Sequence, residues 1–213
     1  MRYRHIIWDW NGTLLDDLWL SVAAMNNLLQ RRKMQPLKQA RYLDIFTFPV
    51  KDYYERLGFD FKVEPFSVSG TEFINEYTRR MFEPALHIGA VPFLEEIHNS
   101  ELSQSLLSAA SQQMLEKLMD YHGLRKYFTK LIGQNNHYAN GKIEAGKAWM
   151  EKLHFRPHEV LFIGDTIHDR EVAEALGADC VLLSHGHTSP ERLLKAGVIV
   201  FRNYRELEEW FFS

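Results

Sequence analysis

The chain has 213 residues, of which 46% are hydrophobic and 25% charged, and its formal net charge is −3. This composition excludes disorder, collagen and coiled coil as the main architecture, and so small a net charge provides no strong positive field for nucleic acid. The length favours one domain, or one domain that carries an insert.

Several further classes are excluded by what the sequence lacks. No run approaches the roughly 18 apolar residues that span a bilayer, and the first residues lack the apolar stretch of a secretory signal. The single cysteine, Cys180, excludes an intramolecular disulfide, and its apolar neighbours predict a small core residue. We therefore expect a cytoplasmic protein with no nucleic-acid or membrane partner; the oligomeric state stays open.

Six short apolar runs predict buried strands. The runs are continuous rather than alternating, which is typical of parallel strands covered on both faces. Helical spacing separates the later runs, and an amphipathic pattern ends the chain. The alternation predicts an α/β fold with a doubly wound, Rossmann-like parallel sheet. The strands are expected at 5–8, 104–107, 130–132, 160–163, 180–183 and 198–201. The helices that alternate with the later strands and end the chain are expected at 111–122, 142–153, 169–176, 189–196 and 203–212.

The stretch between the first two strands differs from the rest, because it contains no convincing strand. Helical spacing over 18–32, 38–46, 50–57 and 71–82 is interrupted by prolines and glycines. We therefore predict an all-helical domain at 16–87, inserted into an α/β core formed by 1–15 and 88–213.

The first strand ends in Asp9-Trp10-Asn11-Gly12-Thr13. Strand side chains alternate, so Asp9 and Asn11 can point the same way at the edge where open parallel sheets bind ligands. Gly12 permits a sharp turn, and Thr13 places a hydroxyl beside an anion that the turn amides can also contact. The competing interpretation is an ordinary strand-to-helix turn.

A second carboxylate cluster follows the fourth strand, where Asp165 and Asp169 lie four positions apart. Carboxylates gathered at one sheet edge are costly unless a cation neutralises them, and oxygen ligands favour Mg²⁺ beside phosphate. The alternative is that Asp165 is a loop residue and Asp169 a helix N-cap.

Two weaker segments complete the set. Ser108 and Ala109 follow the second strand, where a hydroxyl and small residues can bind an anion at a helix N-terminus. Lys142, after Asn140 and Gly141, begins the next helix with an ammonium that can pair with phosphate oxygens. Each has a simpler interpretation, as a cap or a solvated charge, and Lys147 is the competing lysine.

The four segments together, in this order, resemble the four motifs of the haloacid dehalogenase superfamily. Asp9 to Thr13 resembles the first motif, Ser108 the second and Lys142 the third. Gly164-Asp165 with Asp169 resembles the fourth. The stretch 89–97 is similar to the return from cap to core in the phosphoglycolate-phosphatase-like branch, so the resemblance covers essentially the whole chain.

This resemblance implies a Mg²⁺-dependent phosphatase that acts on a small phosphorylated metabolite. It implies that Asp9 attacks phosphorus to form an aspartyl-phosphate. It implies Mg²⁺ held by Asp9, the Asn11 backbone carbonyl and Asp165, with Asp169 completing the site. Ser108 and Lys142 would hold the phosphate oxygens, together with Gly12, Thr13 and Ala109. The helical insert would be a cap that closes over the site.

One residue departs from the family pattern. The second acidic residue of the first motif, usually an aspartate that acts as general acid and base, is Asn11. An amide can do neither near neutral pH, so the leaving group needs little protonation, another group substitutes, or hydrolysis is slow. Candidate substitutes are Asp16, Asp17 and His168. The alternative function is a weakly active or non-catalytic phospho-ligand-binding protein.

Other relatives fit less well. A 2-haloacid dehalogenase needs no Mg²⁺, and a phosphonoacetaldehyde hydrolase needs a cap lysine in a recognisable context, which Lys33, Lys38 and Lys51 lack. A receiver domain carries no helical insert after its first strand. His185 and His187 are more simply a polar loop near the pocket than a metal site. Substrate identity stays open, and the residues able to line the pocket are Trp19, Met25, Asn26, Tyr53, Tyr54 and Arg56.

Overall fold

The centre of the molecule is a six-stranded parallel sheet. The computed structural model describes residues 2–134 and 141–213. The spatial order of the strands is β3-β2-β1-β4-β5-β6, so the chain winds outward from β1 in both directions. The predicted doubly wound sheet is therefore confirmed. Its strands are β1 (His5–Trp8), β2 (Ser103–Ser111), β3 (Lys130–Gln134), β4 (Val160–Gly164), β5 (Asp179–Leu183) and β6 (Ile199–Phe201).

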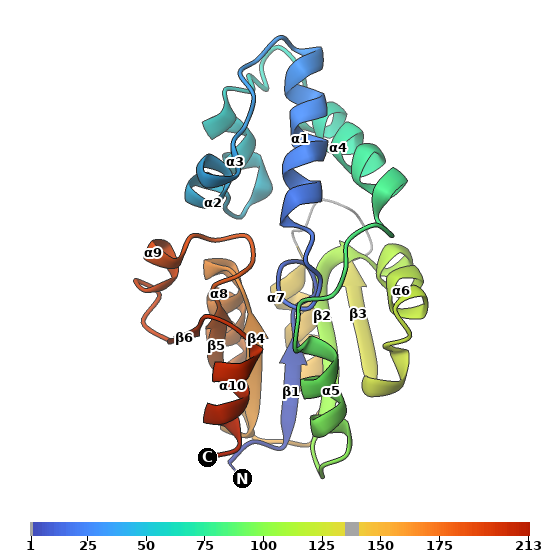
Figure 1. The fold of residues 1–213 in the computed structure, drawn as a ribbon, viewed down its shortest axis with the longest axis vertical. Helices are drawn as coiled ribbons and strands as arrows, with labels where there is room; N and C mark the ends of the chain where they lie inside the picture. Colours follow the sequence, from blue (N-terminus) through green and yellow to red (C-terminus); the bar gives the residue numbers. More distant parts are fainter. Residues whose placement is uncertain (1, 135–140) are drawn as a thin grey trace.

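Helices cover both faces of this sheet (Figure 1). Side chains alternate along a strand, so Ile6 and Trp8 pack in one apolar cluster while Ile7 packs in another. Burial on both faces explains why the strands are continuous apolar runs. The first cluster includes α5 (Ala90–His98), α6 (Gln112–Tyr121) and α10 (Tyr204–Phe211), and the second α7 (Lys142–Met150) and α8 (Ile167–Leu176). Short pieces complete the core: η1 (Arg125–Tyr127), η2 (Pro157–Glu159) and α9 (Pro190–Leu193).

Four helices between β1 and α5 lie beyond the carboxyl ends of the strands (Figure 1). They share an apolar cluster of their own, with Met25, Leu28, Tyr53 and Tyr54 buried in it. No strand occurs between β1 and α5, as the sequence predicts, and every residue of that stretch is described. These helices are α1 (Leu18–Arg31), α2 (Gln39–Ile45), α3 (Val50–Leu57) and α4 (Phe66–Arg80).

Helix α4 is the element that departs most from the prediction, because it begins at Phe66 rather than at 71. Pro65 precedes its first residue, and Gly70, which the sequence pattern marks as a breaker, lies inside the helix. Packing of α4 on α1 outweighs the cost of a glycine in a helix, which is about 1 kcal/mol.

The positions of Cys180 and of the three lysines of the inserted domain bear on two other interpretations of the sequence, a reactive thiol and a reactive cap lysine. Cys180 lies half-buried in β5, where burial raises the pKa of its thiol and makes it a poor nucleophile. Lys33, Lys38 and Lys51 are all exposed and none of them lines the described cavity. Within the described ranges, no helix combines the length and the apolar character needed to cross a membrane.

His5 makes the fold sensitive to acid. Its ring is buried in β1, with Nδ1 2.7 Å from Ser103 Oγ and Nε2 2.7 Å from Ser105 Oγ. Burial lowers the pKa of His5 from 6.5 to about 4. The unfolded chain therefore binds a proton at His5 below about pH 6.5, whereas the folded chain binds it only near pH 4. The stability contribution is complete above pH 6.5 and is lost as the pH falls toward 4.

We expect His5→Gln, which does not titrate, to flatten this part of the pH dependence. Between pH 7 and 4 the wild type should lose about 3 kcal/mol more unfolding free energy than the variant. Urea unfolding at several pH values measures the difference, and curves that stay parallel over this range would contradict it.

Candidate active site

The Asp9 carboxylate lies directly after β1 and is paired with a buried lysine. Lys142, the first residue of α7, contacts Asp9 Oδ1 through its Nζ, and the same ammonium lies 2.6 Å from Asp169 Oδ1. Only 3% of Lys142 is exposed. Although burial lowers it, the carboxylates of Asp169 and Asp9 raise the pKa of Lys142, so the ammonium keeps its charge.

Asp169 is held by the start of α8. Thr166 is the N-cap residue, and its hydroxyl oxygen accepts a hydrogen bond from the Asp169 backbone amide, while Asp169 Oδ2 accepts from the Thr166 backbone amide at 3.0 Å. This reciprocal capping box leaves Oδ1 of Asp169 for Lys142. Thr166, and not Asp169, is therefore the cap, and Asp169 combines a structural role with a place in the charged cluster.

Three buried carboxylates converge at the edge of the sheet. One oxygen each from Asp9, Asp165 and Asp169 lies within 4.8 Å of the others. Burial raises the pKa of Asp9 to about 7 and that of Asp165 to about 8. For Asp169, burial acts in the same direction, but the Lys142 ammonium lowers its pKa. Burial and the neighbouring carboxylates thus favour the protonated forms of Asp9 and Asp165, and a cation at this place would favour the ionised forms.

The donor set fits a divalent cation. The carboxylates of Asp9, Asp17, Asp165 and Asp169 face two buried cations, the Lys142 ammonium and the His187 imidazolium. With all four carboxylates ionised, as they would be around a bound cation, two negative charges remain uncompensated, which is the charge that one Mg²⁺ would balance. Carboxylate oxygens are also the ligands that Mg²⁺ prefers.

Backbone packs closely around Asp165. Gly12 adopts φ +75°, and a Cβ there would lie 2.4 Å from Asp165 Oδ2; a Cβ on Gly186 would lie 2.1 Å from the same atom. Thr13 Oγ1 donates to Asp165 Oδ1 at 2.8 Å, and the His187 amide donates to Oδ2 at 2.6 Å. These contacts explain why the first strand needs glycine and threonine after Asn11.

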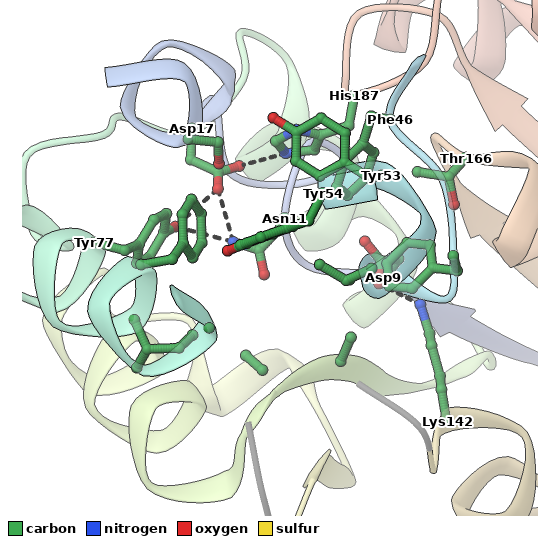
Figure 2. A pocket seen from close by; sticks show the side chains of 18 of the residues that line it. Asp9, Asn11, Asp17, Phe46, Tyr53, Tyr54, Tyr77, Lys142, Thr166 and His187 are labelled. Atoms are coloured by element: carbon green, nitrogen blue, oxygen red, sulfur yellow. Dashed lines mark hydrogen bonds and ion pairs between the residues drawn. The ribbon is translucent and has the colours of Figure 1, made fainter. Parts of the chain in front are cut away.

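Asn11 is part of a second buried network (Figure 2). Its Nδ2 donates to Asp17 Oδ2 at 2.8 Å and to Tyr77 Oη at 3.0 Å, and Tyr77 also donates to Asp17 Oδ2 at 2.8 Å. The other oxygen of Asp17 accepts from the Gly12 amide at 2.9 Å and lies 3.1 Å from His187 Nε2. Asp17 is completely buried and therefore depends on these partners.

The Asp17–His187 pair is charged. Burial disfavours the imidazolium, but the Asp17 carboxylate outweighs it and raises the pKa of His187 to about 9. Burial likewise acts to raise the pKa of Asp17, but His187 and the hydrogen bonds to Asn11 and Tyr77 lower it. On its other side, His187 Nδ1 lies 2.9 Å from Tyr42 Oη.

Above the charged cluster lies a cavity of about 180 Å³. Asp9, Asn11, Lys142 and Asp169 form its polar floor, and Figure 2 shows aromatic side chains from the inserted helices around Asp9 and Asn11. The aromatic residues of this wall include Phe46, Tyr53, Tyr54, Phe66, Phe73 and Tyr77. The cavity thus joins charged groups from the sheet edge to an apolar surface from the inserted domain.

The predicted phosphate-binding residues occupy different positions. Ala109 and Lys142 line the cavity, whereas Gly12, Thr13 and Ser108 are not among the described residues that line it. Ser108 is buried, and its Oγ accepts a hydrogen bond from the Ala110 amide at 3.0 Å. Asn140 lies outside the described residues. Lys147 lies 3.6 Å from Glu144 and is absent from the described lining, so Lys142 is the lysine of this site.

Some of the candidate substitutes for the general acid and of the candidate pocket residues line the cavity, and others do not. Asp17 lines the cavity, but Asp16 is exposed, and His168 Nδ1 lies 3.2 Å from Glu171 Oε2. Tyr53 and Tyr54 line the cavity. The described lining does not include the remaining four, Trp19, Met25, Asn26 and Arg56.

Two residues of the site are absent from the sequence-based prediction. Tyr77 contacts Asn11 and Asp17, and Tyr42 contacts His187. Both lie on inserted helices at positions that helical spacing marks only as apolar. The residues that their hydroxyl groups contact are remote in sequence, so no local pattern identifies these two tyrosines as part of the site.

Comparison with known proteins relates the chain to a family of hydrolases. Residues 6–183 match the model of the haloacid dehalogenase-like hydrolase family. A phosphoglycolate phosphatase of Synechococcus elongatus is 24% identical over 201 residues, covering 90% of this chain and 88% of that protein. An N-acetylmuramic acid 6-phosphate phosphatase of Pseudomonas putida is 23% identical over 200 residues, covering 90% and 87%.

A solved structure shares the fold over nearly the whole chain. The crystal structure of a predicted phosphatase from Clostridium acetobutylicum has a TM-score of 0.84 and 19% sequence identity, and covers 99% of this chain and 98% of that one. The resemblance to the superfamily, inferred from four motif segments, and to its phosphoglycolate-phosphatase-like branch, inferred from the stretch 89–97, is confirmed. This chain belongs to the haloacid dehalogenase-like hydrolase family.

Proposed function

We propose that this chain is a Mg²⁺-dependent phosphoric monoester hydrolase that acts on a small phosphorylated compound, with Asp9 as the nucleophile. The observation that carries the proposal is the convergence of Lys142 with three buried carboxylates, two of which, Asp9 and Asp169, lie at the floor of the cavity. The names of the relatives, which are phosphatases of small phosphorylated compounds, support the reaction class.

The side chains divide the work as follows. A carboxylate oxygen of Asp9 attacks phosphorus, and water later hydrolyses the resulting aspartyl-phosphate. Lys142 holds a non-bridging phosphate oxygen and offsets the charge of the transition state, while it keeps Asp9 oriented. Ser108 and Ala109 supply further polar contacts near the carboxyl end of β2, whereas the Gly12 amide is already bonded to Asp17.

Asp9, Asp165 and Asp169, with the Asn11 carbonyl, would hold the metal ion. Bound Mg²⁺ supplies charge neutralisation, so that an anionic nucleophile can approach an anionic phosphate. Lys142 bridges Asp9 and Asp169 and fixes the separation of these two carboxylates. The pair is therefore oriented before any ligand arrives.

The inserted helices act as a cap in this proposal. Residues 16–87 form the cap domain, and 1–15 together with 88–213 form the core. The separate apolar cluster of the inserted helices supports a cap with its own packing. By covering the floor of the cavity, the cap excludes water and selects the leaving group.

Metal dependence tests the proposal. Phosphate release from a panel of phosphate monoesters should fall by about 10²-fold or more on chelation and return when Mg²⁺ is restored. Mg²⁺ should also raise the melting temperature, because it binds only the folded chain.

Asp165→Asn should remove most of this thermal shift, and the exposed Asp52→Asn should retain it. Activity that is unchanged in chelator would refute the metal-dependent mechanism.

A second function is favoured by one observation, the amide at Asn11. A phospho-ligand-binding protein would retain the charged floor without turning over its ligand. Binding of phosphate esters with no phosphate release, including release from an activated aryl phosphate, would support that function instead.

A further inference from the structure

We infer that the preferred substrate is a monoaryl phosphate, a phosphate ester of a single-ring phenol, rather than a carboxylate-bearing metabolite such as phosphoglycolate. The inference rests on the proposed phosphatase function and assigns its substrate class. Three independent features of the cavity carry it: the chemistry of its wall, its charge balance, and the amide at Asn11.

The wall that faces the leaving group is aromatic. Phe46, Tyr53, Tyr54 and Tyr77 surround the space above Asp9 and Asn11 (Figure 2). Their rings also order one another, since Tyr53 meets Phe46 and Tyr54 edge-on at centroid distances of 5.3 and 5.7 Å. A preformed aromatic wall binds a flat apolar ring with little loss of entropy and with favourable ring contacts.

The same wall offers no cation to a second anionic group. Among the described lining residues, Lys142 is the one lysine or arginine, and it is engaged by Asp9 and Asp169. The remaining cation, His187, is engaged by Asp17. Residues 135–140 contain neither lysine nor arginine. A substrate carboxylate would therefore be buried without a cationic partner, which is unfavourable.

The amide at Asn11 favours a leaving group of low basicity. Asn11 cannot donate a proton to a departing oxygen, and its Nδ2 is already bonded to Asp17 and Tyr77. An alkoxide leaves poorly without protonation. A phenolate leaves as the anion because the ring delocalises its charge. Asn11, which departs from the family pattern, therefore favours aryl phosphates. The aromatic wall favours the same class of ester.

The step balances without a general acid. A carboxylate oxygen of Asp9 bonds to phosphorus as the bond from phosphorus to the phenolic oxygen breaks, and that bonding pair stays on the phenolate, which takes a proton from solvent. Water then adds its oxygen to phosphorus. The acyl-phosphate bond breaks with its pair on the Asp9 carboxylate, and phosphate departs with the remaining proton released to solvent.

The size of the cavity suits a phenol of one ring. Its volume of about 180 Å³ is close to that of an engineered cavity of about 150 Å³ that binds benzene.

Three esters test the inference on the unmodified chain with Mg²⁺: phenyl phosphate, cyclohexyl phosphate and phosphoglycolate. Cyclohexyl phosphate matches the ring in size and apolarity but leaves as an alkoxide. We expect kcat/KM for phenyl phosphate to exceed that for cyclohexyl phosphate by about 10²-fold or more, the scale of a missing general acid. It should exceed that for phosphoglycolate by about tenfold or more, because of the unpaired carboxylate.

A cation placed in the wall should shift this preference. Ile74 lines the cavity from α4 and is half-buried, whereas its neighbour Asn75 is exposed and is not among the described lining residues. Ile74→Arg should raise the ratio of kcat/KM for phosphoglycolate over phenyl phosphate by about tenfold. Asn75→Arg, the matched control, should leave the ratio unchanged.

The outcomes separate the two proposals. Hydrolysis of phosphoglycolate or cyclohexyl phosphate as efficiently as phenyl phosphate overturns the substrate class and leaves the phosphatase function standing. No hydrolysis of any ester with Mg²⁺ present overturns the phosphatase function and the substrate class with it. An unchanged ratio in a folded Ile74→Arg protein overturns the argument from charge.

Discussion

Asp9→Asn should abolish phosphate release, with kcat falling by at least about 10³-fold, because it removes the oxygen that attacks phosphorus. Loss of a nucleophile is among the largest effects that one substitution has on an enzyme. The variant also replaces a carboxylate that contacts Lys142, so the ammonium keeps only Asp169 as a charged partner. Phosphate release under saturating substrate measures the effect.

A matched substitution distinguishes chemistry from a general change of charge. Asp16 lies on the same segment but is exposed, so Asp16→Asn should retain activity within about twofold of the wild type. Circular dichroism should show that both variants are folded. Appreciable turnover by a folded Asp9→Asn protein would remove Asp9 as the nucleophile.

An exchange of two side chains should supply a carboxyl general acid at position 11, where this chain has an amide. In the double variant Asn11→Asp/Asp17→Asn, the carboxylate and the amide trade places. The amide oxygen introduced at position 17 can still accept from the Gly12 amide and from His187, as the native carboxylate does. The amide nitrogen introduced there can donate to the new carboxylate at position 11, across the 2.8 Å that now separates Asn11 Nδ2 from Asp17 Oδ2. The exchange therefore keeps the same partners, with Tyr77 still between the two groups, the directions of the three hydrogen bonds among these side chains reversed, and the negative charge moved from position 17 to position 11.

The expected gain depends on the leaving group. For an alkyl phosphate, kcat/KM should rise by about 10² to 10⁴-fold, the contribution of a general acid and base. For phenyl phosphate the rise should be much smaller, because its cleavage needs little protonation. Steady-state rates with cyclohexyl and phenyl phosphate measure both effects.

The single variants serve as controls for the exchange. Asn11→Asp alone sets a second carboxylate against the buried Asp17, so it should be less stable than the double variant and gain less activity. Asp17→Asn alone removes the charged partner of His187 and should also destabilise the fold. No gain in a folded double variant would show that another residue already delivers the proton.

The sequence predicts the floor of the site well because parallel strands end at one edge of the sheet. Asp9 follows β1, Asp165 follows β4, and Lys142 and Asp169 belong to helices that begin at that edge. The order of strands therefore brings together groups as far apart as Asp9 and Lys142, which are separated by 133 positions. The boundaries of α4 were less predictable, because packing on α1 overrides the local cost of Gly70.

Contacts between residues that do not lie at the ends of neighbouring strands cannot be predicted in this way. The carboxylate of Asp17 and the ring of His187 lie 170 positions apart, and only the folded chain shows that they pair. Tyr77 reaches Asn11 from α4, and the apolar spacing of that helix does not distinguish a hydroxyl in a network from a ring in a core.

The composition and the pattern of apolar runs determined the class of fold, since period and order follow from which faces of a strand or helix are buried. The motif order determined the family and the chemistry of the floor. Tertiary structure decided the wall: which rings surround the leaving group, that no free cation lines it among the described residues, and that the amide of Asn11 is held by Asp17 and Tyr77. These depend on how the inserted helices pack over the sheet edge, which is set by long-range contacts and not by any local period.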